Sequence, residues 1–206
     1  MQAPITIALI AVTCVVSWLA FNNRKLMDRL ILWPPAIERH KQYDRLVGYG
    51  FIHADFMHLF FNMFTLFFFG RYMEGTITEL TGSPWTYLGF YLAALVVSIL
   101  PTYLKHQKDP NYRSLGASGA VSAVLFAFIL FDPWATIGVM FIPMPAIVFA
   151  VLYVGYSIWM DKRGGDNVNH GAHLAGAAFG VLFMVIMEPR VLGHFLQQLG
   201  QPSFGN

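Results

Sequence analysis

Six long apolar runs constrain this chain more than any other feature of its sequence. A helix that crosses a membrane needs about 20 mainly apolar residues, and we expect each run to form one. The expected spans cover residues 4–21, 51–72, 85–104, 115–131, 143–160 and 171–187. The segments between them are short, so we expect residues 1–206 to form a single membrane domain without a second, soluble one.

Composition supports a membrane environment. Of the 206 residues, 56% are hydrophobic and 12% are charged, whereas a typical soluble domain has about 25% charged residues. The chain therefore has more apolar side chains than a soluble core of this size could bury. The net charge is only +2 and no polybasic run exists, which excludes nucleic acid from the expected partners.

The pattern within the runs favours helices. Residues 60–70 and 146–156 are almost continuously apolar, whereas the strands of a membrane barrel alternate between apolar and polar residues. We therefore expect an all-α, polytopic bundle of six transmembrane helices. Residues 134–141 are apolar but too few to cross a bilayer, and we expect them at the membrane interface. Pro143 and Pro145 suit the first turn of the fifth span.

Basic residues are distributed unevenly between the two sides of the expected bundle. The first, third and fifth loops hold 11 of the 13 Lys and Arg residues. The positive-inside rule alone places these loops in the cytosol.

Polar residues inside the spans are few, and they converge on one side. Span two contains His58 and Asn62, span four begins near Ser118, and span six begins near His173. All even-numbered spans of such a bundle start at the same face of the membrane, so these side chains lie at similar depth. Ionisable groups within spans are costly and are functional candidates by default.

Small residues accompany this polar group. Gly116 and Gly119 bracket Ser118, and Gly176 and Gly180 follow His173 on span six. Small residues let two membrane helices approach closely. Spans four and six could then approach closely enough for a hydrogen bond between a serine hydroxyl and a histidine, the arrangement that activates a serine nucleophile.

Three motifs give the chain a resemblance to the rhomboid intramembrane serine proteases, in their minimal six-span form. They are Gly-Ala-Ser-Gly at 116–119, Ala-His-Leu-Ala-Gly at 172–176 and His-Leu-Phe-Phe-Asn at 58–62. The resemblance covers nearly the whole chain. It implies a serine endopeptidase that cleaves transmembrane segments of membrane-protein substrates, with no cofactor and no metal. It also implies a multi-pass protein, which we expect in the bacterial inner (cell) membrane.

The resemblance assigns roles to four residues. Ser118 is the expected nucleophile and His173 the general base, while His58 and Asn62, with the backbone N–H of Ser118, are the expected donors to the oxyanion. Spans four and six carry no Asp or Glu near Ser118 and His173, which favours a Ser–His dyad over a triad. Water must also reach the dyad, so we expect a polar cavity that opens toward the first, third and fifth loops.

The resemblance also raises two questions. Family members normally keep the N-terminus in the cytosol, which opposes the distribution of Lys and Arg, and the orientation stays open. Several relatives place a tyrosine four residues after the nucleophile, packed beside the base, where this chain has Ser122. The group that orients the His173 ring is therefore not evident from the sequence. Family members admit substrate past span five, and Gly164 and Gly165 could supply flexibility there.

Other interpretations of the same residues stay open. The chain could be a catalytically inactive rhomboid-like protein that binds membrane clients, although such relatives usually lack the Ser or the His. It could be a small transporter with a histidine-lined path, which would favour polar groups along the whole path. Ser118 could be a packing residue, and His58 and Asn62 could join helices without catalysis. A metal site is disfavoured because no HExxH motif or carboxylate ligand accompanies the histidines.

Overall fold

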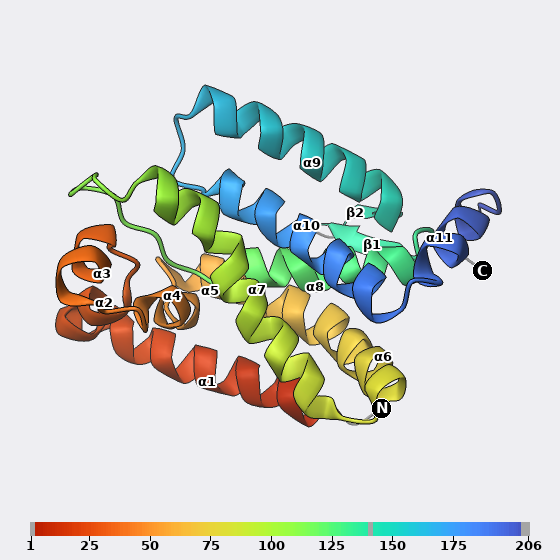
Figure 1. The fold of residues 1–206 in the computed structure, drawn as a ribbon, viewed down its shortest axis with the longest axis horizontal. Helices are drawn as coiled ribbons and strands as arrows, with labels where there is room; N and C mark the ends of the chain where they lie inside the picture. Colours follow the sequence, from red (N-terminus) through yellow and green to blue (C-terminus); the bar gives the residue numbers. More distant parts are fainter. Residues whose placement is uncertain (1–2, 140–141, 203–206) are drawn as a thin grey trace.

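The computed structural model describes residues 3–139 and 142–202 and shows a bundle of long helices, as the sequence predicts (Figure 1). The long helices are α1 (Pro4–Phe21), α7 (Pro84–Lys105), α8 (Ser118–Phe131), α9 (Ala146–Arg163) and α10 (His170–Met187). Shorter helices are α2 (Arg24–Leu30), α3 (Pro34–His40), α4 (Arg45–Gly48), α5 (Phe56–Thr65), α6 (Arg71–Thr81) and α11 (Val191–Leu199). A 3-10 turn, η1, covers Tyr49–Phe51, and a π-helical segment, η2 (Leu66–Gly70), joins α5 to α6.

Three helices, α1, α7 and α10, are long and apolar enough to cross a membrane by length and composition, and Arg45–Phe51 with Phe56–Thr81 forms a fourth candidate bent by 97°. Helix α8 is apolar but has only 14 residues. Helix α9 has 18 residues and ends in the charged sequence Asp161-Lys162-Arg163. The helices thus occupy the six apolar runs, while the number of crossings stays a prediction.

The second run differs most from the expected uninterrupted helix over residues 51–72. Helix α5 begins only at Phe56, after an extended segment, and the side chain of Asp55 caps it by accepting a hydrogen bond from the N–H of His58 at 2.8 Å. A side-chain oxygen at this position satisfies a backbone donor that has no partner within the helix. The cap and the preceding bend place His58 in the first turn of α5.

A short hairpin follows α8, where the sequence analysis expected only interfacial residues. Strand β1 (Thr136–Val139) pairs antiparallel with β2 (Ile142–Pro145), with Thr136 opposite Pro145. Residues 140 and 141 lie outside the described part of the chain. Because β2 takes up residues 142–145, α9 begins at Ala146, three residues after the expected start of the fifth span.

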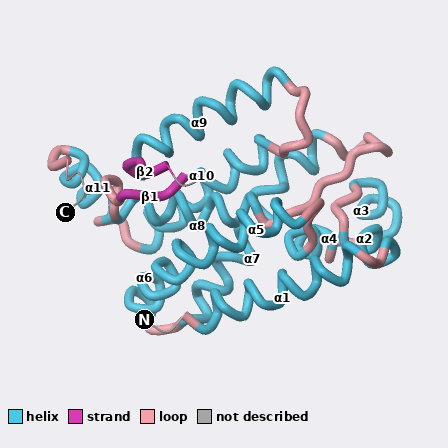
Figure 2. The backbone as a smooth tube through the Cα atoms, turned by 180° about the vertical axis from the view of Figure 1, so that it is seen from behind, coloured by secondary structure: helices cyan, strands magenta, loops and turns pink. Residues whose placement is uncertain are grey.

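Helix α8 lies in the middle of the bundle in both backbone views (Figures 1 and 2). Every residue from Gly119 to Leu130 is buried, which is the pattern of a helix that is apolar all round. Helix α10 packs along α8, and α7 packs against both. Helix α9 lies at the outside of the bundle next to α10.

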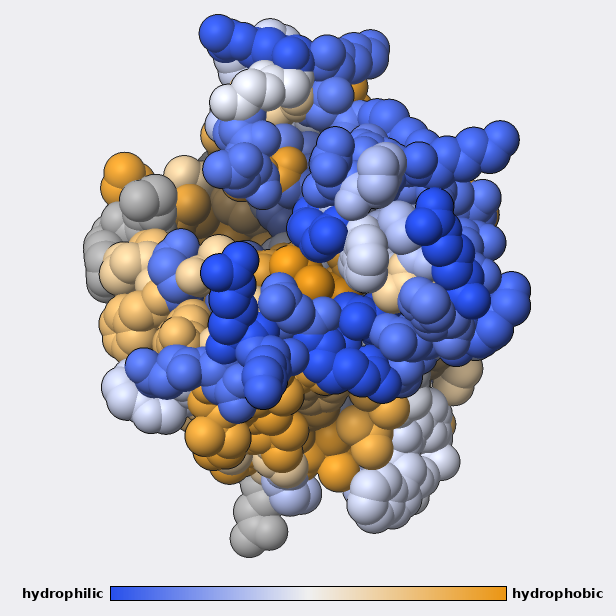
Figure 3. Space-filling model, turned by 90° about the vertical axis from the view of Figure 1, so that its left-hand side faces the viewer, coloured by the Kyte–Doolittle hydropathy of each residue, from blue (hydrophilic) through white to orange (hydrophobic). Residues whose placement is uncertain are grey.

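The connecting segments gather at one end of the molecule. Figure 3 shows polar side chains concentrated at the end where α2, α3 and the segments before α8 and α10 lie, with apolar side chains below them. Arg45 anchors the first loop by donating hydrogen bonds to the carbonyl oxygens of Asp28 (2.8 Å) and Ile31 (2.6 Å). Helices α8 and α10 begin at this polar end.

Glu74 connects two helices at the opposite end. Its carboxylate accepts hydrogen bonds from the backbone N–H groups of Ile5 (2.9 Å) and Thr6 (2.7 Å), in the first turn of α1. A carboxylate at a helix N-terminus satisfies free N–H groups and interacts favourably with the helix dipole. Glu74 is 2% exposed and so caps α1 from α6.

Candidate active site

Ser118 and His173 lie in direct contact. The Oγ atom of Ser118, the first residue of α8, is 2.7 Å from Nε2 of His173, which lies in the first turn of α10. Both residues are partly exposed. The structure thus brings together the hydroxyl and the imidazole expected to form the dyad, at a distance typical of a hydrogen bond.

Glycines allow α8 and α10 to approach so closely. A Cβ atom on Gly176 would lie 2.0 Å from the carbonyl oxygen of Gly119, and one on Gly180 would lie 2.0 Å from that of Ala123. No side chain fits at such a distance, so the backbones touch along two successive turns. Ser118 and His173 lie just beyond this contact, which fixes the separation of their helices.

His58 lies beside the turn that precedes the nucleophile. A Cβ atom on Gly116 would be 2.6 Å from Cε1 and 2.8 Å from Nε2 of the His58 ring. Gly116 also has a φ of 110°, which L side chains rarely adopt. The backbone conformation therefore favours glycine at 116, and its absent side chain lets the imidazole of His58 reach the start of α8.

Asn62 follows one helical turn after His58 and is 6% exposed. Its Nδ2 donates a hydrogen bond to the carbonyl oxygen of His58 at 2.9 Å. The amide thus bonds within its own helix, with one of the two N–H bonds that such a group carries.

His53 binds the backbone of the turn that precedes Ser118. Its Nε2 accepts from the backbone N–H of Ala117 (3.4 Å), and its Nδ1 lies 2.9 Å from Oγ of Ser17. Because Ser17 Oγ donates to the carbonyl oxygen of Phe51 (3.0 Å), it can accept only from His53 Nδ1–H. The hydrogen bonds therefore select the Nδ1–H tautomer of a fully buried histidine. Ser17 of α1 was not evident as a contributor from the sequence.

Asn169 links α10, the helix that carries His173, to the loops, and its role was not evident from the sequence motifs. Its Oδ1 caps α10 by accepting from the N–H of Ala172 (3.0 Å) and also accepts from the hydroxyl of Thr102 (3.0 Å). Its Nδ2 donates to the hydroxyls of Tyr112 (3.1 Å) and Ser114 (3.3 Å). An Asn before a helical run is an N-cap signal, so its position four residues before His173 could have identified it.

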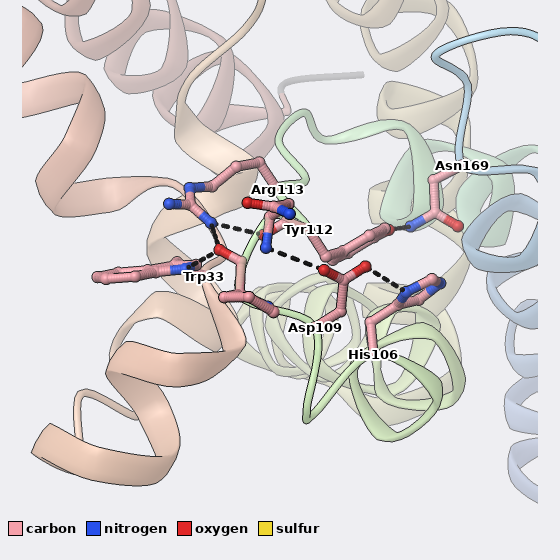
Figure 4. A network of polar contacts seen from close by, with 8 residues as sticks. Trp33, His106, Asp109, Tyr112, Arg113 and Asn169 are labelled. Carbon is pink, nitrogen blue, oxygen red and sulfur yellow. Dashed lines mark hydrogen bonds and ion pairs between the residues drawn. The ribbon is translucent and has the colours of Figure 1, made fainter.

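The contacts of Asn169 continue into a wider network (Figure 4). The Trp33 indole and the Arg113 guanidinium both donate to the carbonyl oxygen of Pro110, and Arg113 lies over the Trp33 ring at 4.4 Å. His106 is stacked on Tyr112 with 4.0 Å between ring centroids. This network joins the first and third loops to the N-terminus of α10.

A histidine–carboxylate pair closes the fifth loop onto α10. Nε2 of His170 donates to Oδ2 of Asp166 at 3.0 Å. This hydrogen bond holds the pKa of the Asp166 carboxyl below its ordinary value of 3.8. The carboxylate is thus engaged by His170, and the ring of His170 in turn lies edge-on to that of His173, with 6.0 Å between centroids.

A polar cavity opens near these residues. It has a volume of about 230 Å³ and lies among the C-terminal end of α7, the C-terminal end of α9 and the start of α10. Thr102, His106, Tyr112, Asn169 and His170 are among the residues that line it. It is on the side expected for water access, but its lining does not include Ser118 or His173.

Tyr153 of α9 lies beside the base. Its ring is nearly parallel to that of His173, at 18° with 6.0 Å between centroids, and its hydroxyl is 2.6 Å from Oγ of Ser122. Tyr153 therefore occupies the place beside the base that a tyrosine at position 122 takes in several relatives, and Ser122 binds its hydroxyl. The aromatic ring comes from α9, a long-range contact that the sequence pattern did not reveal.

The fold and the site define a polytopic helical membrane protein with a contacting serine and histidine at one end of two closely packed helices. The family model described as the Rhomboid domain matches residues 40–190. The chain belongs to the rhomboid family.

Relatives with known names support this membership. RHOMBOID-like protein 12, mitochondrial, of Arabidopsis thaliana is 31% identical over 183 residues, which cover 79% of this chain and 52% of the relative. Rhomboid-related protein 1 of Caenorhabditis elegans is 28% identical over 165 residues, or 75% of this chain and 43% of the relative.

Presenilin-associated rhomboid-like protein, mitochondrial, of Bos taurus is 31% identical over 139 residues, which cover 65% of this chain and 35% of the relative. The matches thus span about a third to a half of the length of these relatives. Two of the three are named as mitochondrial proteins, so they do not favour the bacterial membrane that the sequence analysis expects.

Proposed function

We propose that this chain is an intramembrane serine endopeptidase that uses a Ser118–His173 dyad to cleave transmembrane segments. One observation carries the proposal, the 2.7 Å separation of Ser118 Oγ and His173 Nε2. Peptide hydrolysis requires a nucleophile, a base within hydrogen-bond reach and donors for the oxyanion. The first two are in contact here, on helices whose spacing is fixed by glycine.

The dyad supports a two-step reaction. Ser118 Oγ attacks the scissile carbonyl carbon while its proton passes to His173 Nε2. The tetrahedral intermediate then collapses, the C–N bond breaks and the imidazolium gives its proton to the leaving amine. A water molecule attacks the resulting ester, losing a proton to the same nitrogen, and the ester bond to Ser118 breaks as the imidazolium returns that proton to Ser118 Oγ. The histidine is thus base and then acid in each step.

Stabilisation of the oxyanion would come from two directions. Ser118 is the first residue of α8, and the first N–H groups of a helix have no partner within it. His58 and Asn62 are the proposed side-chain donors from α5, and Asn62 Nδ2 keeps a second N–H besides the one bonded to His58. Loss of one oxyanion donor typically costs about 10²–10³ in turnover.

Asn62→Ala tests that assignment. Turnover should fall by about two orders of magnitude, with little loss of melting temperature. A large fall in melting temperature with normal turnover of the folded fraction would instead assign Asn62 a structural role.

The proposed substrates are transmembrane segments that reach the dyad past α9. Helix α9 lies at the outside of the bundle, and few of its side chains are buried, namely Ala146, Ala150, Ser157 and Met160. Its C-terminal end leads into Gly164 and Gly165, both with positive φ, so no β-carbon restricts the connection to α10. Segments with small, helix-destabilising residues would present an extended backbone at little cost.

The location of the protein is part of the proposal. Apolar helices of spanning length support an integral, multi-pass membrane protein. We propose the bacterial inner membrane on the expected minimal six-span form alone, since the mitochondrial relatives do not favour it. Separation of inner and outer membranes followed by immunodetection of the chain tests this location. Recovery from an organelle membrane of a eukaryote would overturn this location.

Labelling with a fluorophosphonate in detergent tests the dyad. The wild type should be labelled, Ser118→Ala should lose the label, and His173→Ala should keep only a slow residual labelling. Ser157→Ala is a matched control, because it removes a buried hydroxyl of α9 and should leave labelling unchanged. Labelling that survives Ser118→Ala, or the absence of label on folded wild-type protein, would contradict the proposal. The second result would favour a binding protein for membrane clients.

A further inference from the structure

We infer that Tyr153 of α9 is a positioning residue for the His173 imidazole, and that it orients the base from the helix past which substrate is proposed to enter. The inference rests on the proposed protease function. It begins with the ring contact, in which the two planes lie at 18° and the centroids 6.0 Å apart. This separation is within the range of offset-stacked aromatic pairs.

A restraint of this kind is needed because histidine is free to turn about its outer side-chain bond. The torsion that joins an imidazole to its β-carbon has a broad, roughly two-fold distribution. A turn of the ring would move Nε2 away from Ser118 Oγ. The carboxylate of the fifth loop, Asp166, is held by His170. Among the described residues, the ring of His173 is flanked by the edge-on ring of His170 and by the nearly parallel ring of Tyr153, and only the Tyr153 ring comes from another helix.

Tyr153 is itself held from several directions. Its hydroxyl lies 2.6 Å from Oγ of Ser122, which follows Ser118 by one turn of α8. Its ring packs against those of Phe126 and Phe149, with 5.6 Å and 5.3 Å between the ring centroids. The side chain therefore connects α8, α9 and α10, and the Ser122 bond sets where the ring lies relative to the nucleophile.

The arrangement links substrate access to the geometry of the base. Movement of α9 away from the bundle would carry the Tyr153 ring with it and release His173 from its stack. The dyad would then be fully aligned only when α9 has returned to the position seen here. The polar and ring contacts of Tyr153 reach the dyad at His173, so we expect it to act through His173.

Two variants separate the hydroxyl from the ring. Tyr153→Phe keeps the ring and removes the bond to Ser122, and Ser122→Ala removes the same bond from the other side. Each should lower the rate constant of fluorophosphonate labelling about 3–10-fold, and the double variant should fall no further because both changes delete one interaction. Tyr153→Leu removes the ring as well and should lower the rate by about 30–100-fold.

A matched control guards against effects of any buried Tyr→Phe change. Tyr91 of α7 is fully buried and its hydroxyl has no hydrogen-bond partner among the residues the structure describes. Tyr91→Phe should leave labelling unchanged. Melting temperatures in detergent identify any variant that fails to fold.

Two further measurements distinguish positioning from a structural role. With a transmembrane substrate in proteoliposomes, Tyr153→Phe and Tyr153→Leu should lower kcat with KM within about twofold, because a group that acts only on the base leaves substrate binding intact. In a His173→Ala background, Tyr153→Leu should have no additional effect on residual labelling.

Wild-type labelling that depends on Ser118 and His173 but is unchanged by Tyr153→Leu would overturn the positioning role and leave the dyad in place. An added loss from Tyr153→Leu in the His173→Ala background would also overturn it. Folded wild-type protein that takes no label would overturn the dyad and the positioning role together.

Discussion

The hydroxyls of Thr13 and Ser17, one helical turn apart on α1, are both fully buried but have different partners. Ser17 Oγ donates to Phe51 and accepts from His53, whereas Thr13 Oγ1 has no hydrogen-bond partner within the described part of the chain. A hydroxyl contributes to stability through its partners, and a lost partner leaves a buried polar group unsatisfied. The pair therefore offers a matched comparison on a single helix.

Ser17→Ala should destabilise the fold by about 1–3 kcal/mol, since it leaves His53 Nδ1–H and the Phe51 carbonyl without their partner. Thr13→Val, which replaces an unpaired hydroxyl with a methyl group, should be neutral or stabilising. Unfolding in mixed detergent micelles measures both. Equal losses in the two variants would show that the His53 contacts carry no stability of their own.

The contact between α8 and α10 should tolerate no side chain at 176. Gly176→Ala places a methyl group 2.0 Å from the Gly119 carbonyl oxygen, so the helices must separate, at a cost of about 1–3 kcal/mol or more. Fluorophosphonate labelling should also fall, because separation of the helices moves Ser118 away from His173.

Gly155→Ala is the control for that substitution. Gly155 lies within α9, and a Cβ atom there would meet nothing within 4 Å. The melting temperature should rise slightly, since alanine favours a helix by up to about 1 kcal/mol over glycine. If both variants melted alike, close backbone packing would not be what holds α8 to α10.

Asn169 should stabilise the fold in two ways, as the cap of α10 through Oδ1 and as a link to the third loop through Nδ2. Two substitutions separate these contributions. Asn169→Ala removes all four hydrogen bonds of its side chain, whereas Asn169→Asp keeps an oxygen for Ala172 N–H and the Thr102 hydroxyl. Loss of an N-cap costs about 0.5–2 kcal/mol, so Asn169→Ala should melt lowest and Asn169→Asp between it and the wild type. If Asn169→Asp were as unstable as Asn169→Ala, the stability would come from the hydrogen bonds that Nδ2 donates to Tyr112 and Ser114.

The Asp166–His170 pair should make the order of the fifth loop depend on pH. The pKa of Asp166 is lowered by the bond from His170, so the folded state favours the ionised carboxyl. The stabilisation is complete above the ordinary pKa of 3.8 and is lost as the pH falls through the lowered value.

Hydrogen exchange of residues 164–170 measures this effect. At neutral pH the wild type should be better protected than Asp166→Asn, and the difference should disappear on acidification below the lowered pKa. A difference that persists unchanged in strong acid would show that the ionised carboxylate is not its cause.

The sequence was most informative where local pattern determines structure. The apolar run at 4–21 is helix α1, and the small residues of the fourth and sixth runs do pack against one another. The break before α5 could have been foreseen, because Asp55 is a cap residue three positions before His58. The paired strands at 136–139 and 142–145 were missed because a short apolar stretch does not distinguish a strand from an interfacial helix.

The contacts of the site were harder to anticipate. Ser118 and His173 could be paired because motif and spacing placed both at the same end of neighbouring helices. Nothing local connects Tyr153 to His173 or Ser17 to His53, since each pair depends on how separate helices are rotated about their axes. Such rotation is set by packing over the whole bundle, which periodicity alone does not reveal.

Helix α1 is fastened at both ends, and this limits its freedom to slide. Glu74 grips the backbone at Ile5 and Thr6, while Ser17 is tied to His53, about 18 Å further along at 1.5 Å per residue. Because Glu74 binds main-chain N–H groups, these hydrogen bonds do not depend on which side chains occupy positions 5 and 6. A carboxylate near one end of α1 thus sets the position of a hydroxyl near the other end, and through His53 the position of the turn that presents Ser118.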